Sequence, residues 1–475
     1  MVELTVEREA VFGTLPIPKS GRRFGFFDAF LILSGYCIAT WSYTQGVYLT
    51  TLVGFGQLLI GAFFGALLML LIYQLPVILS VRFGIDIWVY LKTVFGHGGV
   101  RLVAVLIIII NFPWYSVCAE LFASSMQNLS AVFGLPLPSW SHLPLAILCA
   151  TAGTVLALRG VAAIAVATRI LVPILIAVGV LVIVIAFRAV PAEAIWSYRP
   201  ARDGNTDNII PYIMSIEANF AFVITLVGGM AGIPRLVRAE RAGYWAGVLG
   251  QGVSGSLFVV AGAVMSIAMQ HVAGQATEDP TLMLATLASP AFALASLMLV
   301  AFANIGTQAV GSYIYGVMLK ASFSSVRYRT LLLILLAYVC GLCAWGGITK
   351  YFGAFLTIAA CVYAPLAALL FADFFIVRRG RFSLRAAFGL PGHGEYSFTR
   401  GFNLVGLFCV AAGVAVSLLI YDPVNSIVHI RPLFMLTPTG ATFVITAALY
   451  CALCRIPRIR RYLFRGEHGA EDGGK

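Results

Sequence analysis

Residues 35–46 read GYCIATWSYTQG, a polar, glycine-bounded stretch in the middle of an apolar run over 27–50. Membrane helices rarely carry such residues at mid-depth, because each unmet N–H or O–H in hydrocarbon costs several kcal/mol. The sixth apolar run contains a second interruption, TLVGGMAGIP over 225–234, whose paired glycines and proline disfavour an unbroken helix. Broken helices in corresponding positions of two repeats enclose a midplane site in many secondary transporters. The spacing predicts a five-plus-five inverted repeat with broken helices 1 and 6, plus two C-terminal helices. Glycines also form packing surfaces in ordinary membrane helices, and that reading stays open for either break alone.

The composition places the whole chain in a membrane. Of its 475 residues 60% are hydrophobic and 11% are charged, whereas a soluble protein carries about 25% charged residues. A helix needs about 20 mostly apolar residues to cross a bilayer. Such runs lie near 27–50, 53–80, 101–128, 143–158, 161–188, 209–232, 243–271, 283–319, 330–349, 352–377, 402–420 and 433–454. They predict an all-α integral membrane protein with about 12 transmembrane helices.

The basic residues predict how the chain is oriented. They gather between alternate runs, and cytoplasmic loops carry an excess of Lys and Arg, so we expect an even number of spans in a plasma membrane with both termini cytoplasmic. Because the net charge of +12 is scattered in these short clusters, we expect no nucleic-acid partner. The connections 81–99 and 279–289 predict short helices along the inner and outer surfaces. The expected segments are a cytoplasmic N-terminal segment 1–26, a first repeat 27–188, a second repeat 189–377, a cytoplasmic loop 378–401, two helices in 402–454 and a basic tail 455–475.

Two further stretches carry candidate binding residues. Residues 111–118 read NFPWYSVC, and the face of Trp114 suits a flat, conjugated ligand, although Trp114 packing between helices explains the same residue. In the eighth run Gln308 and Ser312 lie one turn apart and share a face, where an amide can pair with the edge of a heterocycle. Ala303, Gly306 and Thr307 share another face, where carbonyls and a hydroxyl would meet a small cation. Hydrogen bonding between helices is the alternative use of these residues.

Several motifs resemble one transporter family. Residues 372–380 (ADFFIVRRG), 396–398 (YSF), 401–403 (GFN) and 233–238 (IPRLVR) are similar to signatures of the nucleobase:cation symporters, which include purine, cytosine, allantoin and hydantoin permeases. Phe112–Tyr115 resembles the third-helix segment that carries the base-stacking Trp of that family. The resemblance extends from the first span to about the eleventh.

The resemblance implies a substrate site and a cation site. Trp114 matches the stacking residue, Cys118 lies where some relatives have a Gln, and Leu226 replaces a second aromatic, which puts the usual substrate in doubt. Ser42, Tyr43 and Thr225 at the two breaks, with Gln308 and Ser312, complete the implied substrate site. The implied cation ligands are carbonyls of Ala39, Ser42 and Ala303 and the pair Gly306-Thr307, in which one of two family hydroxyls is missing.

Arg169, Glu120 and Glu217 are charged residues that lie well inside apolar runs. Arg169 lies about 8 residues into the fifth run, roughly 12 Å deep. We hypothesise that it fills or abuts the weakened cation site, which would make transport sodium-independent; a snorkelling or Glu-paired Arg is the alternative. Glu120 and Glu217 would each be a proton carrier, a partner of Arg169 or a packed neutral acid.

These patterns favour one function over two alternatives. The favoured reading is a secondary active transporter that imports a small planar nitrogen heterocycle by alternating access, coupled to Na⁺ or H⁺, with no other cofactor and no metal. A carrier of amino acids or a thiamine-like vitamin on the same fold stays open. A membrane-embedded enzyme is disfavoured, because the six His are scattered and the nine Cys read mainly as small hydrophobes. The oligomeric state is not predicted.

Overall fold

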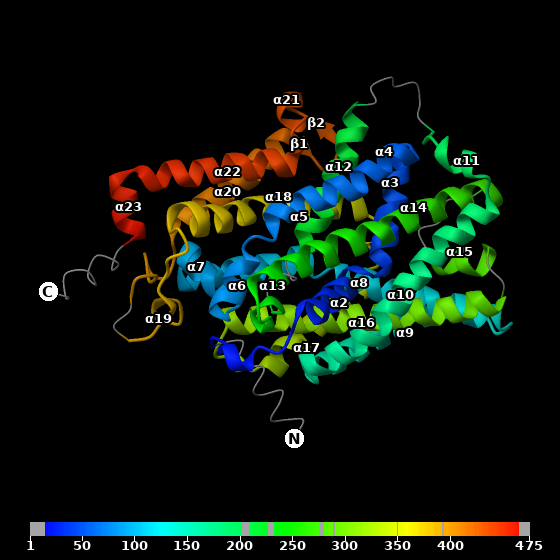
Figure 1. Ribbon diagram of the computed structural model, residues 1–475, viewed down its shortest axis with the longest axis horizontal. Helices are drawn as coiled ribbons and strands as arrows, with labels where there is room; N and C mark the ends of the chain where they lie inside the picture. The colour runs from blue at the N-terminus through cyan, green and yellow to red at the C-terminus, as the bar shows by residue number, and fades with distance from the viewer. Residues whose placement is uncertain are drawn as a thin grey trace.

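The computed structural model describes residues 15–201, 209–226, 232–274, 280–287, 290–348, 350–391 and 394–464. Within them the chain is almost entirely helical, and its long helices run side by side along the longest axis of the molecule (Figure 1). In the first half the helices are α2 Phe26–Cys37, α3 Thr40–Leu52, α4 Phe55–Ile60, α5 Ala66–Tyr73, α6 Val77–Phe83, α7 Ile87–Asn111, α8 Trp114–Val132, α9 His142–Leu158, α10 Val161–Ala189, α11 Ala192–Trp196 and α12 Ile209–Ile224. In the second half they are α13 Glu240–Gly247, α14 Ser254–Ala273, α15 Pro280–Leu287, α16 Pro290–Ser322, α17 Tyr328–Trp345, α18 Phe352–Phe371, α19 Leu384–Ala387, α20 Leu404–Ile420, α21 Arg431–Phe434, α22 Pro438–Arg455 and α23 Pro457–Leu463.

Short irregular elements join these helices. The π-helical turns Gly61–Gly65 and Val248–Val253 connect α4 to α5 and α13 to α14, and a third, Ala372–Val377, extends α18. Turns of 3₁₀-helix lie at Lys19–Gly21, Ser139–Ser141 and Pro234–Leu236. The strands β1 Tyr421–Asp422 and β2 Ile427–Val428 pair antiparallel as a small hairpin after α20.

Every one of the predicted apolar runs contains a helix, which confirms the all-α membrane fold. Among the described residues, 7 helical segments are long and apolar enough to span a bilayer, or 8 if α22 and α23 are taken as one bent span. The total of about twelve spans stays a prediction, and so does the division into repeats at 188 and 377. The short outer helix predicted before the eighth run is present as α15.

The first predicted break is present, although the glycines are not its cause. The helix α2 ends at Cys37 and α3 begins at Thr40, while Ala39 between them is extended (φ −121°, ψ 169°). Gly46 stays helical, and a Cβ there would lie 1.9 Å from the carbonyl oxygen of Val259 on α14. Gly46 therefore permits close packing of α3 against α14.

The second predicted break is only partly described. The helix α12 ends at Ile224, and the next described segment begins at 232 and contains the 3₁₀ turn Pro234–Leu236. The paired glycines Gly228 and Gly229 lie outside the described residues.

The helix predicted along the inner surface is present but is buried. Its residues Ile87–Leu91 and Thr93–Phe95 are all buried, and they form the first part of α7, which is kinked at Gly96 (φ 78°). The sequence 81–99 reads as amphipathic, and the expectation of a surface helix is wrong because the loop 378–403 covers this segment. Gly98 N–H donates to the carbonyl of Gly401 at 2.7 Å, and Asn403 Nδ2 donates to the carbonyl of Val94 at 2.7 Å.

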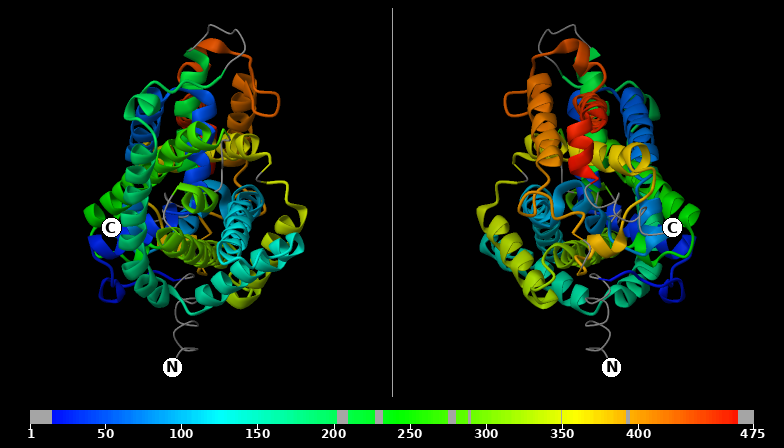
Figure 2. Two further views of the ribbon diagram at one scale, coloured as in Figure 1. Left: turned by 90° about the vertical axis from the view of Figure 1, so that its right-hand side faces the viewer. Right: turned by 90° about the vertical axis from the view of Figure 1, so that its left-hand side faces the viewer.

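The last long helices form their own side of the bundle. Figures 1 and 2 show α20 and α22 together on one side, while α9 and α17 lie on the opposite side. Both α20 and α22 pack on α18. α22 also contacts α12, the helix that precedes the second break, so the C-terminal helices contact the broken part of the fold directly.

Candidate functional site

The first break presents a backbone carbonyl that two side chains satisfy. The carbonyl oxygen of Cys37, at the end of α2, accepts a hydrogen bond from Ser42 Oγ at 2.7 Å and another from Trp41 Nε1 at 3.2 Å. These bonds replace helical partners that the break removes. They fix the indole of Trp41, which is 2% exposed, beside the interrupted chain.

A cavity lies where the two breaks and the stretch 111–118 meet. It has an empty volume of about 190 Å³. Its lining residues come from α2, α3, α8 and the end of α12, and they are Tyr36, Trp41, Trp114, Phe222, Thr225 and Leu226. The structure thus brings Trp114, Thr225 and Leu226 together, as the sequence predicts.

Trp114 both packs between helices and faces this cavity. Its ring makes edge contacts with Trp41 at 5.4 Å, Phe222 at 5.8 Å, Phe352 at 5.4 Å and Phe355 at 5.1 Å between ring centroids. Its Nε1–H is buried and has no hydrogen-bond partner among the described residues. The indole is therefore held firmly while its one polar atom is left for a ligand or water.

Asn111 ties the end of the broken α12 to its neighbours. Its amide Nδ2 donates to the carbonyl of Thr225 at 3.0 Å and also to the hydroxyl of Tyr315 on α16. The Thr225 carbonyl lies at the end of α12, where the helix no longer supplies partners. Asn111 thus connects the stretch 111–118 to the second break.

Three of the six lining residues were missed from the sequence. Tyr36 and Trp41 stand within the quoted stretch 35–46, and their position at the break was the available signal. Phe222 lies four residues before Leu226, one helical turn away, and supplies an aromatic edge next to the aliphatic Leu226. Although Leu226 replaces an aromatic residue of the family, the side chains that line the cavity are mainly aromatic.

The remaining predicted substrate residues are buried but do not line this cavity. Tyr43 packs against Phe258 of α14 at 5.4 Å between ring centroids. The side chain of Gln308 lies against α9, since a Cβ on Gly153 would be 2.4 Å from its Cγ, and neither polar atom of Gln308 has a described partner. Cys118 and Ser312 are also buried, and the Ser312 hydroxyl has no partner within the described residues.

A second cavity contains part of the predicted cation site. It has an empty volume of about 330 Å³ between α2, α10 and α16 and is lined mainly by apolar side chains. Ala303, Gly306 and Thr307 line it together with Gly35 and Thr168. Ala39 and Ser42 do not line it.

The polar groups of this second cavity are few. Thr307 Oγ1 donates to the carbonyl of Gly35 at 3.2 Å, and nothing lies within 4 Å of a Cβ placed on Gly306. The space that a second hydroxyl would occupy at Gly306 is therefore open. The roles of these residues in cation binding stay predictions.

Arg169 does not reach either cavity. Its guanidinium binds Asp28 Oδ1 at 2.6 Å through one terminal nitrogen and at 3.1 Å through Nε, and its side chain is 56% exposed. The side chain pairs with an acid at the start of α2 and is not among the residues that line the second cavity, so the hypothesis that it fills or abuts the cation site gains no support from this contact and stays a prediction. Glu120 and Glu217 are not its partners in this ion pair.

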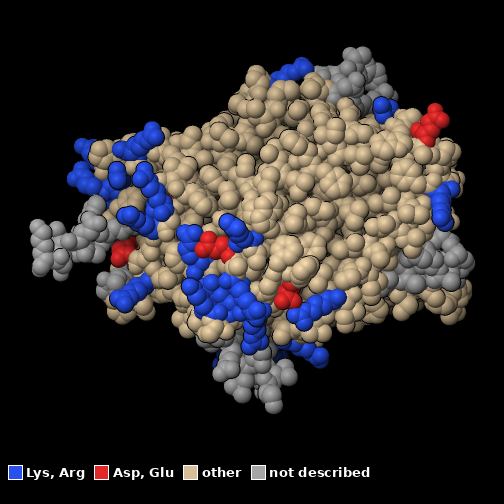
Figure 3. Space-filling view, in the orientation of Figure 1, with Lys and Arg blue, Asp and Glu red and all other residues tan. Residues whose placement is uncertain are grey.

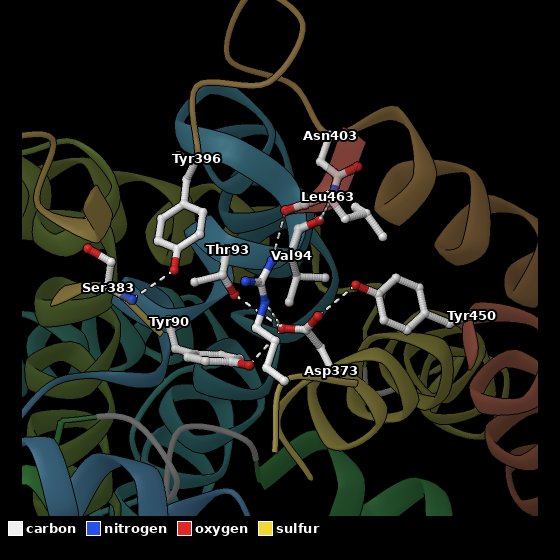
Figure 4. Close-up of polar contacts among 10 residues, drawn as sticks. Tyr90, Thr93, Val94, Asp373, Ser383, Tyr396, Asn403, Tyr450 and Leu463 are labelled. Carbon is white, nitrogen blue, oxygen red and sulfur yellow. Dashed lines mark hydrogen bonds and ion pairs between the residues drawn. The ribbon is translucent and has the colours of Figure 1, made fainter. Parts of the chain in front are cut away.

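The strongest sequence signature forms a buried ion pair away from both cavities. Asp373 Oδ2 accepts from Arg378 Nε at 3.1 Å and from Tyr90 OH at 2.6 Å, while Oδ1 accepts from Tyr450 OH at 2.7 Å (Figure 4). The Arg378 guanidinium lies over the ring of Tyr396 at 5.3 Å. These contacts join α7, the end of α18, the loop 378–403 and α22. The signature therefore holds one end of the bundle together.

The comparisons with known proteins identify the family. The model of a family described as permeases for cytosine/purines, uracil, thiamine and allantoin matches residues 16–441. The chain belongs to this permease family. Its members are transporters, so the chain is a membrane transporter of a small molecule. The family does not favour the alternative hypothesis of a membrane-embedded enzyme. No curated protein matches the chain significantly.

Solved structures with the same fold support this assignment. Mhp1, a nucleobase-cation-symport-1 family transporter, is similar in a closed conformation with bromovinylhydantoin bound, with a TM-score of 0.75 and 19% identity over 95% of this chain and 98% of that one. The inward-facing conformation of Mhp1 gives a TM-score of 0.75 and 19% identity over 96% of both chains. A Na⁺-coupled sialic acid symporter in a substrate-bound outward-open state gives a TM-score of 0.65 and 10% identity over 95% of this chain and 98% of that one. The fold is therefore one on which alternating access is known.

Proposed function

We propose that this permease imports a small planar nitrogen heterocycle, such as a nucleobase, allantoin or a hydantoin, across the plasma membrane. The observation that carries the proposal is the cavity beside the first break and the end of α12, which four aromatic residues line and where the Nε1–H of Trp114 has no hydrogen-bond partner among the described residues. An aromatic wall stacks on a flat ring, and a buried donor without a partner selects a ring with an acceptor at its edge.

The lining argues against an amino acid as the substrate. An amino acid brings a carboxylate and an ammonium group, and its buried charges would need partners. The six lining residues include no charged side chain. Thiamine stays in the substrate panel because the family description includes it.

The distribution of charge supports the proposed orientation in the membrane. Exposed arginines gather at the end of the molecule where α19 and the α22–α23 bend lie (Figure 3). They are Arg379, Arg381, Arg385, Arg455, Arg458, Arg460 and Arg461. Because cytoplasmic loops carry an excess of Lys and Arg, this cluster supports the proposal that this end of the molecule, and both termini, face the cytoplasm. Coupling to Na⁺ or H⁺ would supply the driving force for import.

Ligand binding tests the proposal directly. Thermal-shift measurements on the purified protein would include cytosine, uracil, purines, allantoin, hydantoins, thiamine and amino acids. Replacing a stacking aromatic by Ala costs about 1–3 kcal/mol per base, so we expect Trp114→Ala to weaken binding by roughly fivefold to 150-fold. Trp140→Ala is the matched control because Trp140 is 73% exposed and lies outside the cavity. Binding of amino acids alone, or equal affinity in Trp114→Ala, would contradict the proposal.

A further inference from the structure

Glu217 is a buried carboxylate on α12, the helix that ends at the second break. Its side chain is 1% exposed. Its Oε1 accepts from Thr439 Oγ1 at 2.6 Å, and its Oε2 accepts from Thr439 N–H at 3.0 Å. Thr439 stands in the first turn of α22, so both bonds cross from one helix to the other.

Among the described residues, no cationic side chain forms an ion pair with this carboxylate. The buried Asp373 is paired with Arg378, and the ion pairs Arg169–Asp28 and Arg82–Glu240 lie elsewhere. The ionisable groups that face Glu217 from neighbouring elements of the described chain are the thiol of Cys361 on α18 and the phenol of Tyr421 on β1. Both are neutral near pH 7. An ionised carboxylate buried without a cation costs several kcal/mol, so the packed state requires one positive charge at Glu217.

We propose that Glu217 binds and releases the proton that couples transport to a pH gradient; this rests on the proposed function of heterocycle import. A proton suits the site better than a metal cation does. One donor to the carboxylate is the backbone N–H of Thr439, which cannot ligate a cation. The Thr439 hydroxyl, by contrast, can donate to a carboxylate and can equally accept from a carboxylic acid.

Hydroxyls further along α22 offer a route for water to this carboxylate. Thr442 and Thr446 follow Thr439 by three and seven residues and therefore share its helix face. Both are fully buried, and their Oγ1 atoms have no hydrogen-bond partner within the described residues. Buried water usually occupies polar sites of this kind.

The protonation state of Glu217 acts on the packing of α12. A neutral Glu217 can stay dry between α12 and α22, whereas the ionised form must be hydrated and favours a state in which the two helices separate. The next residue, Ala218, accepts a hydrogen bond from Gln45 Nε2 of α3 at 3.1 Å. Thr225 and Leu226 of the cavity follow on the same segment. A proton therefore biases the helices that form the cavity, as coupling requires.

The test uses the full-length protein in liposomes with a trapped pH indicator. A heterocycle that binds in the thermal-shift screen is added outside, in sodium and in choline buffer. We expect substrate-driven acidification of the lumen in both buffers. At one proton per substrate, a gradient of one pH unit supports about tenfold accumulation.

The decisive variant is Glu217→Gln, which keeps the size and hydrogen bonding of the protonated acid. We expect it to bind and exchange substrate as the wild type does, with proton movement and gradient-driven accumulation lost. Glu120→Gln, a second acid within an apolar run, should keep both. Wild-type uptake without proton movement, sodium-dependent uptake instead, or proton movement that survives in Glu217→Gln would each overturn the proposal. If no heterocycle binds at all, the proposed function itself fails.

Discussion

Removing Arg378 alone should destabilise the protein more than removing Arg378 and Asp373 together. Asp373 is 0% exposed and Arg378 is 3% exposed, so Arg378→Met leaves an uncompensated buried carboxylate. Breaking a buried ion pair from one side costs about 3–5 kcal/mol. In the double variant Asp373→Asn/Arg378→Met neither charge remains. Because the two residues are in contact, we expect the double variant to be about 1–3 kcal/mol more stable than Arg378→Met alone.

The stability cost of removing single hydroxyl donors to Asp373 can be compared with the cost of removing Arg378. Tyr90 and Tyr450 each donate one hydrogen bond to the carboxylate, at 2.6 and 2.7 Å. A hydrogen bond to a charged group contributes about 1.5–3 kcal/mol. Tyr90→Phe and Tyr450→Phe should therefore each cost less than Arg378→Met.

Thermal unfolding in a fixed detergent measures these differences as shifts of the midpoint. With roughly 2–4 °C per kcal/mol for domains of moderate size, and less for a larger chain, we expect Arg378→Met to lower the midpoint by about 5 °C or more. Arg381→Met is the matched control, because Arg381 is exposed and makes no ion pair among those described. The reasoning is refuted if Arg378→Met matches the control, or if the double variant is as unstable as the two single losses added together.

Three further predictions concern single side chains. Gly306→Ser should fold normally, because nothing lies within 4 Å of a Cβ placed at this position. In this variant the thermal shift caused by a bound ligand should be larger in sodium than in choline. Equal shifts in the two salts would show that the added hydroxyl does not create a cation site. Arg169→Gln breaks a pair whose Arg side chain is 56% exposed, so it should cost no more than about 1 kcal/mol in a thermal midpoint and leave the sodium response of binding unchanged. Gly46→Ala places a Cβ 1.9 Å from the Val259 carbonyl and should sharply reduce the monodisperse yield in size-exclusion chromatography, whereas Gly56→Ala, with nothing within 4 Å, should not; equal yields would contradict the close packing of α3 on α14.

The helices and the first break could be predicted because local chemistry determines them. Apolar runs must form helices in lipid, and the polar residues 35–46 cannot face hydrocarbon. The position of the break at Ala39 could not be read from the glycines, since Gly46 serves packing against α14, a contact between distant parts of the chain.

The errors arose where a distant segment decides the environment of a residue. The stretch 81–99 reads as an amphipathic surface helix, yet the loop 378–403 lies over its helical part. Arg169 has its partner Asp28 141 residues away, and no local pattern marks that pairing. Phe222 was missed because the cavity side of α12 depends on how α8 packs against the break. In each case the missing information was a tertiary contact.

The end of α2 joins the two cavities, and this arrangement explains how a cation and a substrate would influence each other. Tyr36 lines the aromatic cavity, while the adjacent Gly35 lines the other cavity and accepts the hydrogen bond from Thr307. Any change that pulls Thr307 from the Gly35 carbonyl acts on the same helical turn that positions Tyr36. Coupling requires only that each ligand prefer the same arrangement of a shared element. If a cation binds at Thr307, the last turn of α2 would be that shared element, because a change at Gly35 moves Tyr36 with it.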